Sequence, residues 1–339
     1  MDSLTQIVLG AAVGEVVLGR KIGNRAQLAG AIAGTIPDLD ILATMYYDDT
    51  LSEIVIHRSY SHALFCHLLA AFPFAWISWL LNKKKAPYMG WYWLWFFALT
   101  THALLDACTT YGTQLFLPFS NYLVGFNNIS VIDPLYTLPF MAFLIGCLFL
   151  GRDDPKRIKW AWRGIVISSS YMLLTFGVKW HINNTFRNAL KEQSIAYERM
   201  STSPTFFNNA LWAGMAYNDS TLIVGEYSVL QKDKWIDFVQ YKRNLHLENE
   251  FRSRELDALK WFSQGLYFLE KRDSQTLRVY IVKWGRANYE KTRPEEAFIF
   301  YHEIKKTKAG FTLDAIRPKF TKEDFNKAFG QLWRRIWEK

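Results

Sequence analysis

The sequence predicts an α-helical multi-pass membrane domain of about six helices, residues 1–181, followed by a small soluble α+β domain, residues 182–339. Nearly all long apolar runs lie in the first part, whereas Lys, Arg, Asp and Glu are concentrated in the second. Apolar runs of about 20 residues are long enough to cross the hydrocarbon core of a bilayer. Alternating β-branched and aromatic residues in the second part are typical of strands.

The first two predicted helices, 3–19 and one from about residue 26, are rich in small residues. A capping-box pattern over residues 3–6 predicts where the first helix begins. Each helix carries two glycines four residues apart, which let membrane helices approach closely, so we expect tight packing. The pairs are Gly10 with Gly14 and Gly30 with Gly34. Both helices are weakly apolar, and a half-buried or re-entrant arrangement remains open.

A break is expected inside the second helix. Pro37 disturbs helical hydrogen bonding. In a continuous helix two residues at i and i+2 point apart, whereas in an extended turn they share one side. The break therefore allows Asp38 and Asp40 to converge.

Four further helices complete the membrane domain, and the basic loops predict its orientation. The helices are expected at 62–81, 89–109, 133–150 and 161–180. Cytoplasmic loops carry an excess of Lys and Arg, and the basic loops 20–25, 82–85 and 152–159 all fall on one side. The N-terminus, the loops 47–61 and 109–132 and the C-terminal domain then lie on the opposite face, which is periplasmic in a Gram-negative cell.

The C-terminal part is predicted to be mostly antiparallel, with a helix at each end. The pattern favours helices at 183–200 and 321–337 and strands at 221–230, 235–241, 265–269, 276–284 and 297–305.

Seven ligand-type residues lie near the outer ends of the predicted helices, on the non-cytoplasmic half. His102 and Asp106 are four residues apart and share one helix face. Imidazoles and carboxylates together suit Zn²⁺ or Mn²⁺, and seven candidates are too many for one tetrahedral ion. We expect one or two divalent ions, a pair being suited to phosphoester hydrolysis. The candidate ligands are Asp38, Asp40, His57, His62, His102, Asp106 and Asp133.

Two further residues are candidates for catalytic roles. Arg58 lies between the candidate ligands and suits a phosphoryl oxygen. Glu15 is an ionisable group in a membrane helix, where a functional or paired role is the default.

Structural alternatives remain open for some candidates. His102 and Asp106 could form only a structural hydrogen bond between helices. Asp133 before Pro134 also fits a helix N-cap. His67 lies inside an apolar run and is expected to be packed or hydrogen-bonded.

Five motifs together resemble the YdjM-like family of bacterial inner-membrane proteins, which are described as metal-dependent hydrolases. The motifs cover roughly residues 1–140. The resemblance implies a location in the cell inner membrane and a metal-dependent hydrolase, without a substrate. The motifs are Met1-Asp2-Ser3-Leu4-Thr5-Gln6, Pro37-Asp38-Leu39-Asp40, His57-Arg58-Ser59-Tyr60-Ser61-His62, His102-Ala103-Leu104-Leu105-Asp106 and Asp133-Pro134-Leu135-Tyr136.

The hypothesis from the sequence is a membrane-bound hydrolase in which metal-activated water attacks a phosphoester, or a similar ester, of a lipid-linked substrate at the non-cytoplasmic face. Expected partners are the lipid bilayer and an anionic phospholipid or lipid-linked substrate. The net charge of +9 suits anionic lipid better than nucleic acid in a membrane protein. The alternatives are a metal transporter or sensor with the same residues, with ligands spread across the membrane depth, and a scaffold whose polar residues only join helices.

Overall fold

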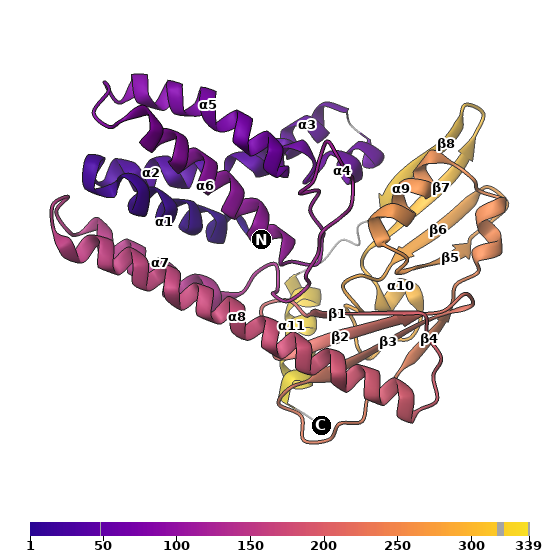
Figure 1. The fold of residues 1–339 in the computed structure, drawn as a ribbon. Coiled ribbons are helices and arrows are strands. Elements are labelled where there is room, and N and C mark those ends of the chain that lie inside the picture. Colours follow the sequence, from indigo (N-terminus) through magenta and orange to yellow (C-terminus); the bar gives the residue numbers. More distant parts are fainter. Residues whose placement is uncertain (48, 317–321, 338–339) are drawn as a thin grey trace. The chain divides into compact units, whose positions relative to one another are not determined.

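The computed structural model describes residues 1–47, 49–316 and 322–337, and the chain divides into two compact units (Figure 1). Unit 1 comprises Met1–Tyr47 and Val55–Phe176, and unit 2 holds the remaining described residues. The longest helix, α8, contributes its first half to unit 1 and its second half to unit 2.

Unit 1 is helical, and all six predicted apolar segments contain helices. In unit 1, α1 packs against α2, α6 and α7, while α5 packs against α6 (Figure 1). The break at Pro37 is confirmed, because α2 is followed by a 3-10 turn. The helices are α1 (Ser3–Ile22), α2 (Asn24–Ala33), η1 (Ile36–Leu39), α3 (Asp40–Tyr47), α4 (Thr50–Ile56), η2 (Tyr60–His62), α5 (Leu64–Leu81), α6 (Tyr88–Ala107), α7 (Pro134–Leu148) and α8 (Pro155–Glu192).

Two local expectations were wrong. Helix α1 is capped by Asp2, whose carboxylate accepts a hydrogen bond from the Thr5 backbone N–H, rather than by Ser3. The predicted helices 161–180 and 183–200 are joined into the single helix α8, which ends at Glu192. His181 and Ile182, which lie between the two predicted helices, continue α8 because neither is a helix-breaking Pro or Gly.

Two of the described helices, α1 and α5, are long and apolar enough to cross a membrane, and α7 is a shorter apolar helix. Helix α5 is mostly exposed, with Phe72, Trp76 and Ile77 among its exposed side chains. A large exposed apolar surface on one helix is typical of a lipid-facing segment. The prediction of about six spans remains a prediction for the other helices.

Close packing of α1 on α2 depends on the four glycines. A Cβ atom placed on Gly10 or on Gly30 would overlap the backbone carbonyl oxygen of the other, and Gly14 and Gly34 meet backbone in the same way. The backbones of the two helices are therefore in direct contact, as the spacing predicted. This contact sets the position of the chain that leaves α2 and enters η1.

The three basic loops gather at one end of unit 1. Gly23 lies against the side chain of Arg152, and the Asn24 side chain donates a hydrogen bond to the carbonyl of Leu148. Gly90, which follows the loop 82–85, lies against Leu18 near the same end of α1. The opposite end of α1 meets the C-terminal end of α6, where Gln6 contacts Asp106.

Unit 2 contains two antiparallel four-stranded sheets, in the orders β1-β2-β3-β4 and β5-β6-β7-β8. Tyr241 of β4 stacks on Phe268 of β5, and both belong to a core that draws residues from both sheets. Strands β1, β2 and β8 and helix α9 were not predicted, and Thr321 of the predicted terminal helix lies outside the described residues. The elements are β1 (Arg199–Pro204), β2 (Leu211–Tyr217), β3 (Thr221–Ser228), β4 (Val239–Lys242), η3 (Leu245–Asn249), α9 (Arg254–Ser263), β5 (Tyr267–Lys271), β6 (Thr276–Ile281), α10 (Pro294–Ala297), β7 (Tyr301–Thr307), β8 (Gly310–Ile316) and α11 (Lys322–Trp337).

The contact between α1 and α2 predicts a specific sensitivity to added volume. Gly30→Ala should destabilise unit 1 by about 1–3 kcal/mol, because the new methyl group must displace the backbone of α1. Gly177→Ala in α8 is the matched control, because a Cβ there meets nothing within 4 Å. Thermal unfolding of the two purified variants beside the parent protein measures the difference. Equal midpoints for both variants would contradict the tight contact.

Candidate metal centre

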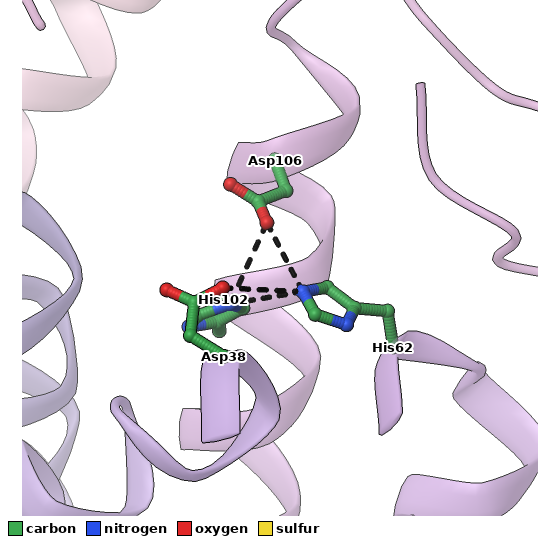
Figure 2. A group of neighbouring side chains, drawn as sticks. All are labelled: Asp38, His62, His102 and Asp106. Atoms are coloured by element: carbon green, nitrogen blue, oxygen red, sulfur yellow. Dashed lines mark hydrogen bonds and ion pairs between the residues drawn. The ribbon is translucent and has the colours of Figure 1, made fainter. Parts of the chain in front are cut away.

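Four polar side chains from three segments converge at the end of unit 1 that is remote from the basic loops (Figure 2). Asp38 comes from η1, His62 from η2, and His102 and Asp106 from consecutive turns of α6. The predicted sharing of one face by His102 and Asp106 is confirmed. One ligand atom from each of the four residues lies within 4.8 Å of every other. We call this group the four-residue centre.

The separations between these ligand atoms match a single small metal ion. Ligands about 2.0–2.1 Å from a tetrahedral ion lie roughly 3.3 Å from one another. Nε2 of His62 lies 3.1 Å from Oδ2 of Asp106 and 3.2 Å from Nε2 of His102. Nε2 of His102 lies 3.4 Å from Oδ1 of Asp38 and 3.5 Å from Oδ2 of Asp106, and His62 lies 3.7 Å from Asp38.

Hydrogen bonds at Nδ1 of His62 and of His102, on the side of each imidazole ring that faces away from the centre, orient the rings so that Nε2 faces the centre. Nδ1 of His102 donates to the carbonyl oxygen of Gly34 at 2.6 Å, because a carbonyl can only accept. The Ser61 hydroxyl donates to Oδ2 of Asp40 at 2.7 Å and accepts from Nδ1 of His62 at 2.9 Å. Such bonds fix the tautomer and the ring orientation of metal-bound histidines. In their neutral forms, with the proton on Nδ1, both imidazole rings turn the lone pair of Nε2 toward the centre.

The centre therefore presents four acceptors to one point. His62, His102 and Asp106 are almost fully buried, whereas 23% of the Asp38 side chain is exposed and gives solvent access. Burial raises the pKa of Asp38, but the imidazoles of His102 and His62, in their protonated forms, outweigh this effect and lower the pKa below the ordinary value. Asp38 is thus ionised at neutral pH, as a metal ligand requires. The donor set, two imidazoles and two carboxylates, fits Zn²⁺ or Mn²⁺.

Asp106 also has basic and amide neighbours. Its carboxylate accepts a hydrogen bond from the Gln6 side chain at 3.0 Å, contacts the Met1 amino group, and lies 3.1 Å from Nε of Arg58. Arg58 is itself buried, donates to the Thr109 hydroxyl at 3.0 Å, and has a positive φ of 59°. Positive φ is costly for a side chain of this size, and such strain gathers at functional sites.

His57 and Asp40 form a second layer beside the four-residue centre. Nδ1 of His57 lies 2.8 Å from Oδ1 of Asp40, whose other oxygen accepts from the Arg58 backbone N–H. Burial raises the pKa of Asp40, while hydrogen bonds from His57 and Ser61 lower it, and the net shift is downward. His57 is partly exposed, and its ring centroid lies 6.3 Å from that of His62. The prediction that both residues bind metal remains a prediction, since neither belongs to the four-residue group.

The remaining candidates are not members of the four-residue centre and have other partners. Asp133 caps α7 and accepts from the Tyr171 hydroxyl, as the N-cap alternative expected. Glu15 pairs with Arg157 through two bonds of 2.7 Å and accepts from Gln27. It lies roughly 14 Å further along α1 than Gln6, at 1.5 Å per residue. His67 is hydrogen-bonded to the Ser61 carbonyl, as expected.

Three contributors were not predicted from the sequence as parts of the site: Ser61, Gln6 and the carbonyl of Gly34. The Ser61 hydroxyl connects His62 to Asp40. Gln6 was detectable in principle, since it is an amide in a predicted membrane helix, where a polar side chain has a cost. A backbone carbonyl leaves no signal in a sequence.

The connection through Ser61 predicts a loss of metal affinity without loss of a ligand. Ser61→Ala should weaken metal binding by about 10–100-fold, because Nδ1 of His62 loses the acceptor that fixes its tautomer. Ser59→Ala is the matched control, since the Ser59 side chain makes no cap hydrogen bond to η2. Competition with a chromophoric chelator measures both affinities. An unchanged affinity in Ser61→Ala would show that the hydroxyl does not orient His62.

Comparisons with known proteins agree with the motifs. The family described as "YdjM inner membrane protein" matches residues 1–185. The uncharacterized protein YfhP of Bacillus subtilis (strain 168) is 28% identical over 149 residues, which make up 42% of this chain and 45% of that protein. The chain thus spans less than half the length of this curated relative. No solved structure matches the chain significantly. Because the family match covers more than half of the chain and includes the whole four-residue centre, this chain belongs to the YdjM family of inner-membrane proteins.

Proposed function

We propose that this protein is a membrane-bound, metal-dependent hydrolase that cleaves a phosphoester, or a similar ester, of a lipid-linked substrate. The observation that carries the proposal is the convergence of two imidazole nitrogens and two carboxylates on one point. Four acceptors at such short separations repel one another unless a cation or protons lie between them. Asp38, His62, His102 and Asp106 would hold the ion. When bound, Zn²⁺ or Mn²⁺ supplies Lewis acidity and activates water for attack.

The protein's own residues supply the remaining functions of a hydrolase. Arg58 lies at the edge of the four-residue centre, beside Asp106, and is suited to hold an anionic phosphoryl oxygen. His57, oriented by Asp40, is partly exposed and is suited to transfer a proton to the leaving group. In a two-ion centre His57 and Asp40 would instead be metal ligands.

A lipid-linked substrate is supported by the apolar surface beside the centre. Leu39, Ile41, Leu42 and Tyr60 are each about half exposed, and they neighbour Asp38, Asp40 and His62 in sequence. An exposed apolar patch at the opening of a polar site suits an acyl or isoprenyl chain. The clustering of the ligands at one end favours a hydrolase over a transporter, for which ligands spread across the membrane depth are expected.

Metal content and activity test the proposal together. Asp106→Asn should reduce bound Zn or Mn from about one ion per chain to below about a tenth, and should abolish activity. Elemental analysis of detergent-purified protein measures the metal. Phosphate release from phosphatidic acid and from an isoprenyl diphosphate in mixed micelles measures hydrolysis. Negligible metal in the parent protein and in the variant alike would refute the proposal.

Three additional variants make this result specific. His62→Gln should also lose the metal, and it guards against an Asp106 variant that fails to fold. Asp133→Asn should keep both metal and fold, because Asn caps helices almost as well as Asp. His57→Ala distinguishes the two forms of the centre, since a one-ion centre keeps its metal and loses only turnover. A two-ion centre would lose about half of its metal in that variant.

We also propose that the centre faces the non-cytoplasmic side, with several helices crossing the inner membrane and unit 2 in the periplasm. Support comes from the gathering of the three basic loops at the opposite end of unit 1.

A single cysteine tests this orientation. The native Cys66, Cys108 and Cys147 are all free and can be replaced. Asp49→Cys in that background should react with a membrane-impermeant maleimide added outside spheroplasts. Labelling only after the membrane is opened would place this loop in the cytoplasm instead.

A further inference from the structure

The C-terminal helix α11 carries bulky aromatic residues on the face that does not pack on unit 2. Its inner face is fixed, since Leu332 and Ile336 pack with Leu211 and the Ser228 hydroxyl donates to the Ile336 carbonyl at 2.7 Å. On the other side Trp333 and Trp337 are each 57% exposed, and their ring centroids lie 5.8 Å apart. Phe329, one turn earlier, is 47% exposed, and its ring lies edge-on to that of Phe207. A second apolar face on a helix suits contact with an apolar or interfacial environment.

Positive charge borders this aromatic stripe. At 100° per residue, Lys327 and Arg334 lie on one flank of the stripe, and both are exposed. Arg334 also forms an exposed ion pair with Glu290 at 3.3 Å, a contact too weak to hold it against a competing anion. Residues 177–339 contain 28 of the 40 Lys and Arg but 20 of the 31 Asp and Glu, and so carry almost all of the net charge.

A neighbouring loop extends the same surface. Leu230, 47% exposed, donates its backbone N–H to the Ser228 hydroxyl that also holds the end of α11. Lys232 and Lys234 follow in the exposed part of this loop. The surface therefore combines half-exposed apolar side chains, two tryptophans and several basic groups.

This combination fits the headgroup region of an anionic bilayer. Tryptophan prefers the membrane interface, where its ring is half buried and its N–H remains hydrated. Basic side chains on the flank of an apolar stripe bind anionic lipid. Unit 2 is also joined covalently to unit 1 through α8, so the inner-membrane location of the family tethers it to a bilayer. A tethered domain needs little intrinsic affinity to dock.

We propose that the exposed face of α11, with Trp333 and Trp337 as its anchors, docks unit 2 on the surface of an anionic phospholipid membrane. The hydrolase activity is not needed for this docking. The docking holds the domain at the depth where lipid headgroups lie.

Spin-label accessibility in nanodiscs tests this docking on the full chain. Asn326→Cys, in a background without the native cysteines, places a nitroxide on the exposed face and keeps both tryptophans. In nanodiscs that contain phosphatidylglycerol, the label should be relaxed by oxygen more than by a water-soluble nickel chelate. Ala309→Cys, in the exposed turn between β7 and β8, is the control and should favour the nickel chelate.

Loss of the anchors and of the lipid charge should reverse the result at position 326. Trp333→Ala with Trp337→Ala should weaken docking by roughly a hundredfold or more, while Leu332 and Ile336 keep the helix folded. Nanodiscs of phosphatidylcholine alone should weaken it as well. A label that favours the nickel chelate in anionic nanodiscs overturns the proposal. So does a label that neither reagent reaches in any lipid, because protein would then cover this face.

Discussion

Electrostatic repulsion among four converging acceptors is the constraint on which the N-terminal unit depends. The two Nε2 atoms of His62 and His102 lie 3.2 Å apart, with carboxylate oxygens of Asp38 and Asp106 beside them. In a buried site this arrangement is unfavourable without positive charge at the point of convergence. Arg58 lies at the edge of the group rather than at that point. The group could therefore hold a metal ion, and the surrounding structure keeps the four acceptors close together.

The packing of α1 and α2 does much of this holding. Their backbones touch at the four glycines, and the chain leaving α2 places the Gly34 carbonyl against His102 and Asp38 against both rings. Gln6, from α1, binds Asp106. A stripe of small residues, which has no chemistry of its own, thus determines where Asp38 and the Gly34 carbonyl lie. It also places the Gln6 side chain that binds Asp106. Van der Waals contact between backbones is a rigid support, because no side chain there can change rotamer.

The sequence predicted the four members of the centre because each is a polar residue at the end of an apolar segment, where burial has a cost. It could not separate ligands from their neighbours. His57 and His62 are both imidazoles in one loop, and only the pairing of His57 with Asp40 distinguishes them. Asp133 and Glu15 are buried acids of the same kind, and their partners Tyr171 and Arg157 are distant in sequence. Partners that the fold alone brings together leave no local pattern.

The strands of unit 2 show a similar limit. Strand β2 is buried along nearly its whole length, so the alternation of apolar and polar residues that reveals a half-exposed strand is absent. It also contains Ala and Gly, which are uncommon in strands. Strand β1 contains two serines and a proline, residues typical of turns. By contrast β3 and β6, rich in β-branched and aromatic residues, were predicted close to their observed bounds.

The buried pair of Glu15 and Arg157 has a consequence for how the chain is made. The two residues are separated by 142 positions. At about 5–20 residues per second, Glu15 therefore waits roughly 7–28 s for its partner during synthesis. Gln27, only 12 residues later, is the earliest of its partners to be made. A lone carboxylate is expensive in an apolar environment, so α1 depends on the hydrogen bond from Gln27 to Glu15 during this interval. Completion of α8 then supplies the cation that pairs with Glu15 in the finished fold.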